Sequence, residues 1–317
     1  MKRPRKPLRR QGGLSAAELM VAMAIGALVT LLAVSLLLVS NANAVAQADV
    51  ASVDDAGRYA LGAIERAVRQ TGFTDLSDAS AAALADPAAP PAVYGLDAAS
   101  LSSATPAVAS PRPAVANGSD ILALRFSGSG SGAGDGSAVT CAGFSVGAAQ
   151  QGWSIFYVAT SAAGDTELRC KYKGAKGWSA DAVIGGVDSF QVLYGIDTDA
   201  AGDGVANNFI SAGQVNLMDH ALPVEGDSAL EQARSRMRRS TWRRVASVRV
   251  ALVLRGAHNS VNARARDVWH LFGEAYSTAS GSGDEGTQLT NAAFTPTLRQ
   301  RERRMFTTTI SLRNAQR

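Results

Sequence analysis

The chain has 317 residues, 46% of them hydrophobic, which is enough for one large domain or two ordinary ones with packed cores. Its formal net charge of +4 arises at the N-terminus, where the first ten positions hold six basic residues and no acid. The rest of the chain is close to neutral, so charge alone excludes a protein that binds nucleic acid through a generally basic surface.

The longest apolar run covers residues 14–39 and follows directly on this basic leader. Its length is about 26 residues, and roughly 20 suffice to cross a bilayer as a helix. A secretory signal peptide would have a shorter apolar core with small residues after it, whereas here Gly13 comes before the run. The sequence therefore predicts a single membrane span with the basic leader in the cytoplasm.

Glu18 is an acid inside this apolar run. A carboxylate in a lipid-facing helix is unfavourable unless it finds a partner. Cleavage after Gly13 would create a new α-amino group at Leu14. In a helical polymer, Glu18 of one subunit could then meet the amine of the next subunit. The competing interpretation is that the Glu18 side chain simply reaches the membrane interface.

The spacing of Gly13, Leu14 and Glu18 resembles the class III signal of type IV prepilins and pseudopilins. That signal is a short basic leader ending in Gly, then a hydrophobic first mature residue, and Glu at the fifth mature position. Leu14 departs from the usual Phe. The resemblance implies that prepilin peptidase removes residues 1–13 on the cytoplasmic side and that Leu14 is N-methylated.

Beyond the apolar run, small and apolar residues recur at spacings of three or four from Val45 to Val68, and no Pro interrupts them. This periodicity predicts an amphipathic continuation of the same helix. Gly72 is a suitable C-terminal stop. We therefore expect one helix over residues 14–72, with its first half in the membrane or polymer core and its second half against a sheet.

In residues 73–317, short apolar runs are separated by Gly, Ser, Ala and Pro, a pattern that predicts a β-rich exported domain. Residues 79–116 contain six of the ten prolines and are predicted to be an irregular, exposed connection. An antiparallel sheet with one face on the helix would bury the strands, which gives an α+β fold. The predicted strands are residues 120–126, 153–159, 167–173, 187–196, 246–255 and 306–313.

The two cysteines, Cys141 and Cys170, both fall in the predicted exported part. An even number of cysteines in an oxidising compartment favours a disulfide. Closing a loop of this size would stabilise the fold by about 3–4 kcal/mol. The competing interpretation is a pair of unrelated buried thiols.

Several blocks in order along the chain resemble the W-type minor pilins, the PilW family. These blocks are residues 57–61, 69–73, 117–126, 186–199 and 304–314. The resemblance implies a type IV pilin-like fold, in which a long N-terminal helix packs on an antiparallel β-sheet domain. It also implies a non-catalytic minor subunit that takes part in priming pilus assembly, with the pilus tip as one expected position.

The resemblance further implies a location and partners. The chain would cross the inner membrane once, with its C-terminal domain in the periplasm, and would reach the cell surface in the assembled pilus. Its partners would be other minor pilins, the major pilin, the inner-membrane assembly platform and, in many systems, a large tip adhesin. A J-type minor pseudopilin of type II secretion would share this architecture and is the closest alternative.

A second alternative is a pilus-borne module that binds DNA or a surface through a basic patch with one aromatic residue, Trp242. Phosphates bind such patches, and aromatic rings can stack on bases. Contact with a partner subunit and a solvated face are the competing interpretations. The patch consists of Arg234, Arg236, Arg238, Arg239, Arg243 and Arg244.

An acidic turn containing Asp197, Asp199 and Asp203 suits Ca²⁺, which prefers several oxygen ligands from a tight loop. Asp197 and Asp199 match the first and third positions of the EF-hand pattern. Ala201 and Asn208 stand where its fifth and twelfth positions need ligands. An acidic, Gly-rich turn without a metal is therefore the competing interpretation. No other cofactor is predicted.

Two short patterns are typical of enzymes, but neither has the context that catalysis needs. Residues 143–147 match the nucleophile-elbow spacing without a helix signal after them. Residues 281–286 match a dinucleotide-binding spacing, but their acids would repel a pyrophosphate. The three histidines form no recognisable pattern. The sequence predicts a protein that is not an enzyme.

Overall fold

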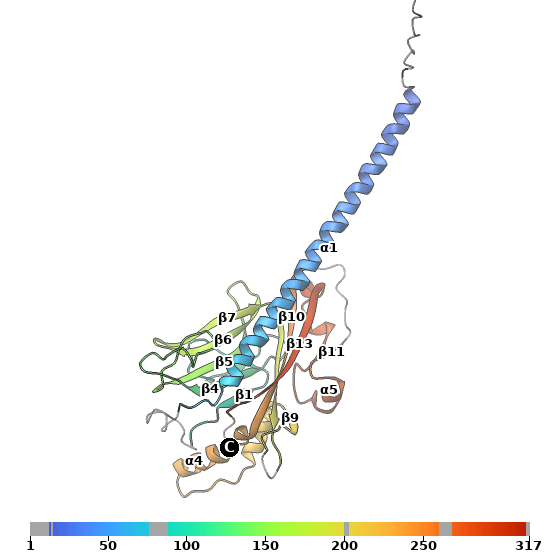
Figure 1. Ribbon diagram of the computed structural model, residues 1–317. Coiled ribbons are helices and arrows are strands. Elements are labelled where there is room, and N and C mark those ends of the chain that lie inside the picture. Colours follow the sequence, from blue (N-terminus) through green and yellow to red (C-terminus); the bar gives the residue numbers. More distant parts are fainter. Residues whose placement is uncertain (1–12, 14, 76–87, 200–202, 260–267, 315–317) are drawn as a thin grey trace, which may run out of the picture. The chain divides into compact units, whose positions relative to one another are not determined.

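The computed structural model describes residues 13, 15–75, 88–199, 203–259 and 268–314 (Figure 1). The leader up to residue 12 and Leu14 lie outside these residues. One long helix, α1 (Ala16–Gln70), leads into a mixed α+β part. The chain divides into two units, Met1–Ala48 and Asp49–Arg317, which we call the first and second unit and describe separately.

The first unit contains the apolar part of α1. An 18-residue window of this helix has a mean hydropathy of 2.6, and none of that window is buried. Leu31, Leu36 and Leu37 are each about 70% exposed. The hydroxyl of Thr30 donates to the Gly26 carbonyl within the same helix, so this polar group is satisfied without water. By length and composition, this segment is suited to serve as a single-pass membrane anchor.

In the second unit, the rest of α1 buries one stripe of small and apolar side chains. The stripe includes Val53, Ala60, Ile64 and Val68, at helical spacing. The helix ends as Gly72 takes up a left-handed conformation (φ +73°), and the Gly72 N–H donates to the carbonyl of Arg125 on a neighbouring strand. Glycine adopts this conformation without strain, which explains the stop.

Two antiparallel sheets share a hydrophobic core with this stripe. One has five strands in the order β1-β4-β5-β6-β7, and the other has four in the order β13-β10-β8-β9 (Figure 1). The first sheet is built from β1 (Val93–Leu96), β4 (Ile121–Ser127), β5 (Gln151–Thr160), β6 (Thr166–Gly174) and β7 (Gly177–Gly185). The second is built from β8 (Val187–Ile196), β9 (Asn208–Ile210), β10 (Val245–Asn259) and β13 (Arg301–Ser311).

The central strand β10 shows why side-chain alternation matters. Val250 and Leu252 point to one face of the strand and lie in the core shared with α1. Ala251 and Val253 point to the opposite face and pack under a smaller layer. That layer includes β11 (Val268–His270), a short helix α5 (Glu274–Ser280) and β12 (Gln288–Thr290). All six predicted strands are present, although β13 begins five residues before its predicted start.

The prediction that residues 79–116 form an irregular, exposed connection is wrong for the described part of that segment. It contains β1, which pairs with β4, and the short pair β2 (Ala99–Ser100) and β3 (Arg112–Pro113). Val93 and Leu101 are buried. An edge strand pairs on one side only, so short segments between prolines can join a sheet. Residues 79–87 lie outside the described residues.

Besides the short helix α5, two longer helices of the second unit were not predicted. They are α3 (Ala212–His220) and α4 (Ala229–Arg239), followed by the 3₁₀ turn η2 (Thr241–Arg244). Each helix begins with a capping box, Ser211 with Gln214 and Ser228 with Glu231. This Ser-x-x-Gln/Glu spacing is visible in the sequence and is the signal that would have located both helices.

Candidate functional site

The predicted assembly residue Glu18 lies in the first turn of α1. Its carboxylate accepts a hydrogen bond from the Ser15 N–H (2.9 Å), and the Ser15 hydroxyl accepts one from the Glu18 N–H (3.2 Å). This is a capping box, which also places a negative charge at the positive end of the helix. Glu18 is exposed, so the same carboxylate is accessible to another chain. Its pairing with a neighbouring amine stays a prediction, and Leu14 lies outside the described residues.

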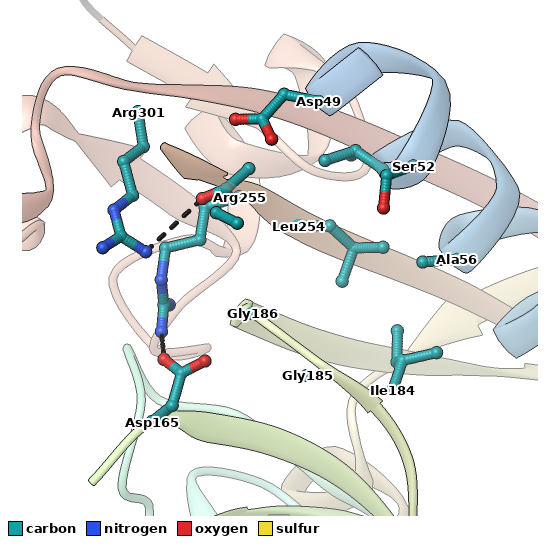
Figure 2. A pocket seen from close by; sticks show the side chains of 13 residues that line it. Asp49, Ser52, Ala56, Asp165, Ile184, Gly185, Gly186, Leu254, Arg255 and Arg301 are labelled. Atoms are coloured by element: carbon teal, nitrogen blue, oxygen red, sulfur yellow. Dashed lines mark hydrogen bonds and ion pairs between the residues drawn. The ribbon is translucent and has the colours of Figure 1, made fainter. Parts of the chain in front are cut away.

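Where α1 enters the second unit, a cavity of about 290 Å³ lies between the helix and the sheets. Figure 2 shows Asp49, Ser52 and Ala56 of α1 on one wall, with Ile184 and Leu254 from the strands opposite them. The cavity therefore combines an apolar floor with a charged rim. Its lining joins side chains of α1 to side chains of the two sheets.

Asp49 connects this part of α1 to β10. One carboxylate oxygen accepts a hydrogen bond from the His258 N–H (2.9 Å), and the other lies 2.8 Å from His258 Nδ1. Burial raises the pKa of Asp49, but the hydrogen bonds from the His258 side chain and backbone outweigh it and hold the pKa below its ordinary value. The carboxylate is therefore charged at neutral pH and anchors the start of the buried helix.

A buried charge cluster joins the strands beside the cavity. Arg255 on β10 forms ion pairs with Asp165 and Asp188, and Arg303 on β13 donates to Asp188 through Nε (2.6 Å). The side chains of Arg255, Arg303 and Asp188 are 3%, 5% and 6% exposed, whereas Asp165 is 50% exposed. Charges at this depth need partners, so the cluster ties β8, β10 and β13 in one arrangement.

The helix is also clamped to β13 by a salt bridge. Arg304 Nη1 lies 3.0 Å from a carboxylate oxygen of Asp54, and these residues are 250 positions apart in the sequence. At the end of α1, the side chain of Asn314 donates to the Thr71 carbonyl (3.3 Å). The C-terminal strand thus follows the buried part of α1 over most of its length.

The predicted disulfide is present. Cys141 and Cys170 are bonded, with their Cα atoms 5.9 Å apart and 29 positions apart in the sequence. Cys170 lies on β6 within the main core, and Cys141 packs against that core from the turn before β5. The bond therefore fastens a turn to β6, the strand between β5 and the edge strand β7.

The structure brings Asp197, Asp199 and Asp203 together, with one oxygen of each carboxylate within 4.8 Å of the others. Both oxygens of Asp197 already accept backbone hydrogen bonds, from Asp199 and from Gly204 (3.1 and 2.7 Å). Such bonds are typical of an acidic turn with or without a metal. Calcium binding stays a prediction.

Two residues of the predicted basic patch, Trp242 and Arg243, are not free on the surface. Trp242 is 3% exposed and packs between the rings of Tyr94 and Tyr194, with centroids 5.1 and 4.7 Å away, so it cannot stack on a base from solution. Arg243 is half-buried and bridges two carbonyls, those of Met237 (2.8 Å) and Ala89 (2.6 Å). The arginines that remain on the surface are Arg234, Arg236, Arg238, Arg239 and Arg244.

The two enzyme-like patterns lie in turns. Ser145 forms an isolated bridge with Val139, which differs from the strand–turn–helix setting of a nucleophile elbow. Residues 281–286 follow the short helix α5.

Comparison with known families decides the classification. The model of a family described as type IV pilus-assembly protein W, PilW, matches residues 155–314, about half of the chain. This chain belongs to the PilW family. The match includes two blocks on which the resemblance rested, residues 186–199 and 304–314, while the blocks before residue 155 lie outside it. Membership in PilW favours the pilus subunit over the J-type pseudopilin.

Two further comparisons accompany the PilW match. A solved structure, the type IV-like pilin TTHA1219 from Thermus thermophilus, aligns with a TM-score of 0.36 and 12% identity. The alignment covers 84% of this chain and all of that one. Among curated proteins, nothing matches the chain.

Two of the blocks on which the resemblance rested are distant in sequence but adjacent in the second unit, although only the later one lies inside the PilW match. The side-chain amide of Asn117 donates to the Asp188 carbonyl (2.7 Å), and that of Gln191 donates to the Gly118 carbonyl (2.8 Å). The blocks at 117–126 and 186–199 therefore meet across the edge where β4 approaches β8. This PilW-family chain is a structural subunit associated with a type IV pilus, and its apolar helix is consistent with a single-pass anchor.

Proposed function

We propose that this chain is a minor pilin that takes part in priming type IV pilus assembly. The observation that supports the proposal is an apolar helix with a fully exposed surface, headed by Glu18 and joined to a β-rich unit of the PilW family. An apolar surface of this length is unfavourable in water and must be covered by lipid or by other helices. In the polymer, the same segment that anchors the subunit before assembly would pack against its neighbours.

The proposal includes a location and a set of partners. The chain would lie in the inner membrane with the second unit in the periplasm, and prepilin peptidase would process it at Gly13 and Leu14. Its partners would be other minor pilins, the major pilin, the assembly platform and a large adhesin at the tip. Support comes from the basic leader, which favours a cytoplasmic N-terminus.

The decisive experiment separates the two roles that Glu18 has in the structure, helix capping and charge. Both variants are expressed in a strain from which the wild-type gene for this protein has been deleted. Glu18→Gln removes the negative charge and keeps a side chain that can accept the capping hydrogen bond. Ser15→Ala removes the capping hydroxyl and keeps the charge of Glu18. We expect both variants to insert in the membrane. We expect the Gln variant to be depleted from sheared pili and from complexes with other minor pilins, and the Ala variant to be retained.

The outcomes distinguish the explanations. Equal incorporation of Glu18→Gln and wild type would reject the charge pairing between subunits. Loss of Ser15→Ala with normal incorporation of Glu18→Gln would show that Glu18 acts through the capping box alone. Normal pilus number in a strain without the protein would argue against a role in priming.

A further inference from the structure

Helix α4 is held firmly on the surface of the second unit, at its periphery in Figure 1. Its start is closed by the capping box of Ser228 and Glu231, and its end by Arg243, which binds the Met237 carbonyl. Ser235 is the one residue of α4 that is buried, and its hydroxyl accepts a hydrogen bond from the Glu225 N–H (3.2 Å). The helix is thus a preformed element and not a frayed loop.

The face that α4 shows to solvent is its apolar one. Leu230, Ala233 and Met237 follow one another at spacings of three and four residues, which places them on one side of the helix. Leu230 is 63% and Met237 36% exposed. At 3.6 residues per turn, Ser235 lies on the opposite side. A surface helix normally buries its apolar stripe. In α4 the apolar stripe is exposed instead, and it has no partner among the described residues.

Arginines border this stripe on both sides. Arg234 and Arg238, one helical turn apart, lie next to Leu230, and Arg236 lies on the far side of Ala233. Arg236 and Arg238 form no ion pair with any residue that the structure describes, whereas Arg239 pairs with Glu225 (2.6 Å). Placing two arginines four residues apart disfavours the free helix slightly. Nearby carboxylates would reverse that effect.

Helix α3 also carries exposed apolar side chains. Leu217 and Met218 on α3 are 70% and 41% exposed. The Asp219 carboxylate accepts hydrogen bonds from Ser240 and Thr241. The end of α4 is therefore fixed to the end of α3.

We propose that α4 is a docking site for another subunit of the pilus machine, which would receive the stripe in an apolar groove bordered by carboxylates. This rests on the proposed function, which supplies the class of partner. Anchors at positions i, i+3 and i+7 are the pattern of helix-in-groove recognition. The charges would set the register and the rate of association.

The chemistry favours a protein over the other anionic partners. DNA would satisfy the arginines but leave Leu230 and Met237 in water, and Trp242 is buried and cannot stack on bases. An anionic membrane would need a larger apolar face than an 11-residue helix with one Leu and one Met provides.

The test uses the full-length protein in detergent, co-expressed with each of the other minor pilins of the same organism. Two double variants separate the apolar contribution from the electrostatic one. Leu230→Ser with Met237→Ser replaces the large apolar side chains of the stripe. Arg234→Glu with Arg238→Glu reverses the charge beside it. Arg112→Glu, an exposed change on β3, is the matched control. We expect both α4 variants to weaken capture of one minor pilin about tenfold. The control should leave capture unchanged, and the thermal unfolding of all variants should match that of wild type.

The possible failures are distinguishable. If wild-type protein captures none of the minor pilins, the proposed function itself fails. If it captures one and both α4 variants capture it equally well, the docking site alone is overturned. The arginine variant can also be tested with a 30-base-pair duplex and with vesicles containing phosphatidylglycerol. Loss of binding to either probe, with subunit capture intact, would assign α4 to nucleic acid or lipid and overturn the proposal.

Discussion

Gly57 on α1 lies directly against the ring of Phe306 on β13. A Cβ atom at position 57 would stand 2.4 Å from Cζ of that ring, closer than any real contact. Any larger residue here would force the Phe306 ring to shift, so glycine lets the helix and the strand approach this closely. The contact joins α1 to a strand that lies inside the part of the chain matched by the PilW family.

Replacing Gly57 with Ala tests this contact. In a helix interior the change alone would stabilise by up to about 1 kcal/mol. Here we expect overpacking to reverse the sign and to destabilise the protein by about 1–3 kcal/mol. Gly62→Ala is the control, because its nearest neighbour is the end of the flexible Arg66 side chain at 3.7 Å. Thermal unfolding of both variants measures the difference, and a stabilised Gly57→Ala would contradict the close contact.

The N-terminus of the assembled protein is the second prediction. We expect mass spectrometry of the protein from sheared pili to show a first residue at Leu14 carrying one methyl group. Cleavage requires the Gly13–Leu14 bond, so Gly13→Val should leave the leader in place and keep the protein in the membrane fraction. An intact Met1 in assembled pili would rule out this processing.

The third prediction concerns the buried charge cluster. Asp188→Asn leaves Arg255 and Arg303 without the carboxylate that both contact. Loss of one partner from a buried ion pair is strongly destabilising, so we expect about 3–5 kcal/mol. Asp165→Asn removes a half-exposed partner of the same Arg255 and should have an effect of about 1 kcal/mol or less. Chemical denaturation compares the two, and equal effects would show that burial does not decide the contribution.

The fourth prediction is a pH dependence that belongs to Asp284. Burial raises the pKa of this carboxyl to about 6, although a hydrogen bond from the Tyr276 hydroxyl (2.8 Å) opposes the change. Between pH 4 and 6 the folded state therefore keeps a proton that the unfolded state has lost. Stability falls as pH rises through this window and levels off above it, with about 3 kcal/mol as the upper limit.

Asp284→Asn should remove this contribution. Measured between pH 4 and 8, the unfolding temperature of the variant should change less with pH than that of wild type. Glu285→Gln is the control, because Glu285 is exposed and adjacent in sequence. Burial raises the pKa of Asp120, and the charges of Asp97 and Asp284 add to this, so Asp284→Asn also removes the part of the Asp120 effect that comes from Asp284. Identical pH profiles for wild type and Asp284→Asn would contradict the assignment.

The fifth prediction is calcium binding by the acidic turn. If Asp197, Asp199 and Asp203 share an ion, millimolar Ca²⁺ should raise the unfolding temperature of wild type, because a ligand that binds only the folded state stabilises it. Asp199→Asn should weaken this response while leaving the stability without calcium nearly unchanged. Mg²⁺ serves as the control ion, since it demands stricter geometry. A flat response of wild type to Ca²⁺ would identify an ordinary acidic turn.

The central elements of the fold could be predicted because their signals are local. A strand buried on both faces, such as β8, reads as a short apolar run, and a buried helix face repeats every three or four residues. The edge strand β7 has one buried position among nine, and β1 is only four residues long, so neither gives a clear apolar pattern in the sequence. The capping boxes of α3 and α4 were local signals as well and would have located both helices.

The sequence by itself determined the class of protein: a basic leader, an apolar run, Glu18 five residues after Gly13, and two cysteines in an exported domain. These features depend on neighbours along the chain or on the compartment. Only the tertiary structure decided that Trp242 is buried between tyrosines, that Asp54 meets Arg304, and that α4 turns its apolar side outward. Such pairings join residues up to 250 positions apart, and no spacing within a short segment records which distant surface the packed core will bring against it.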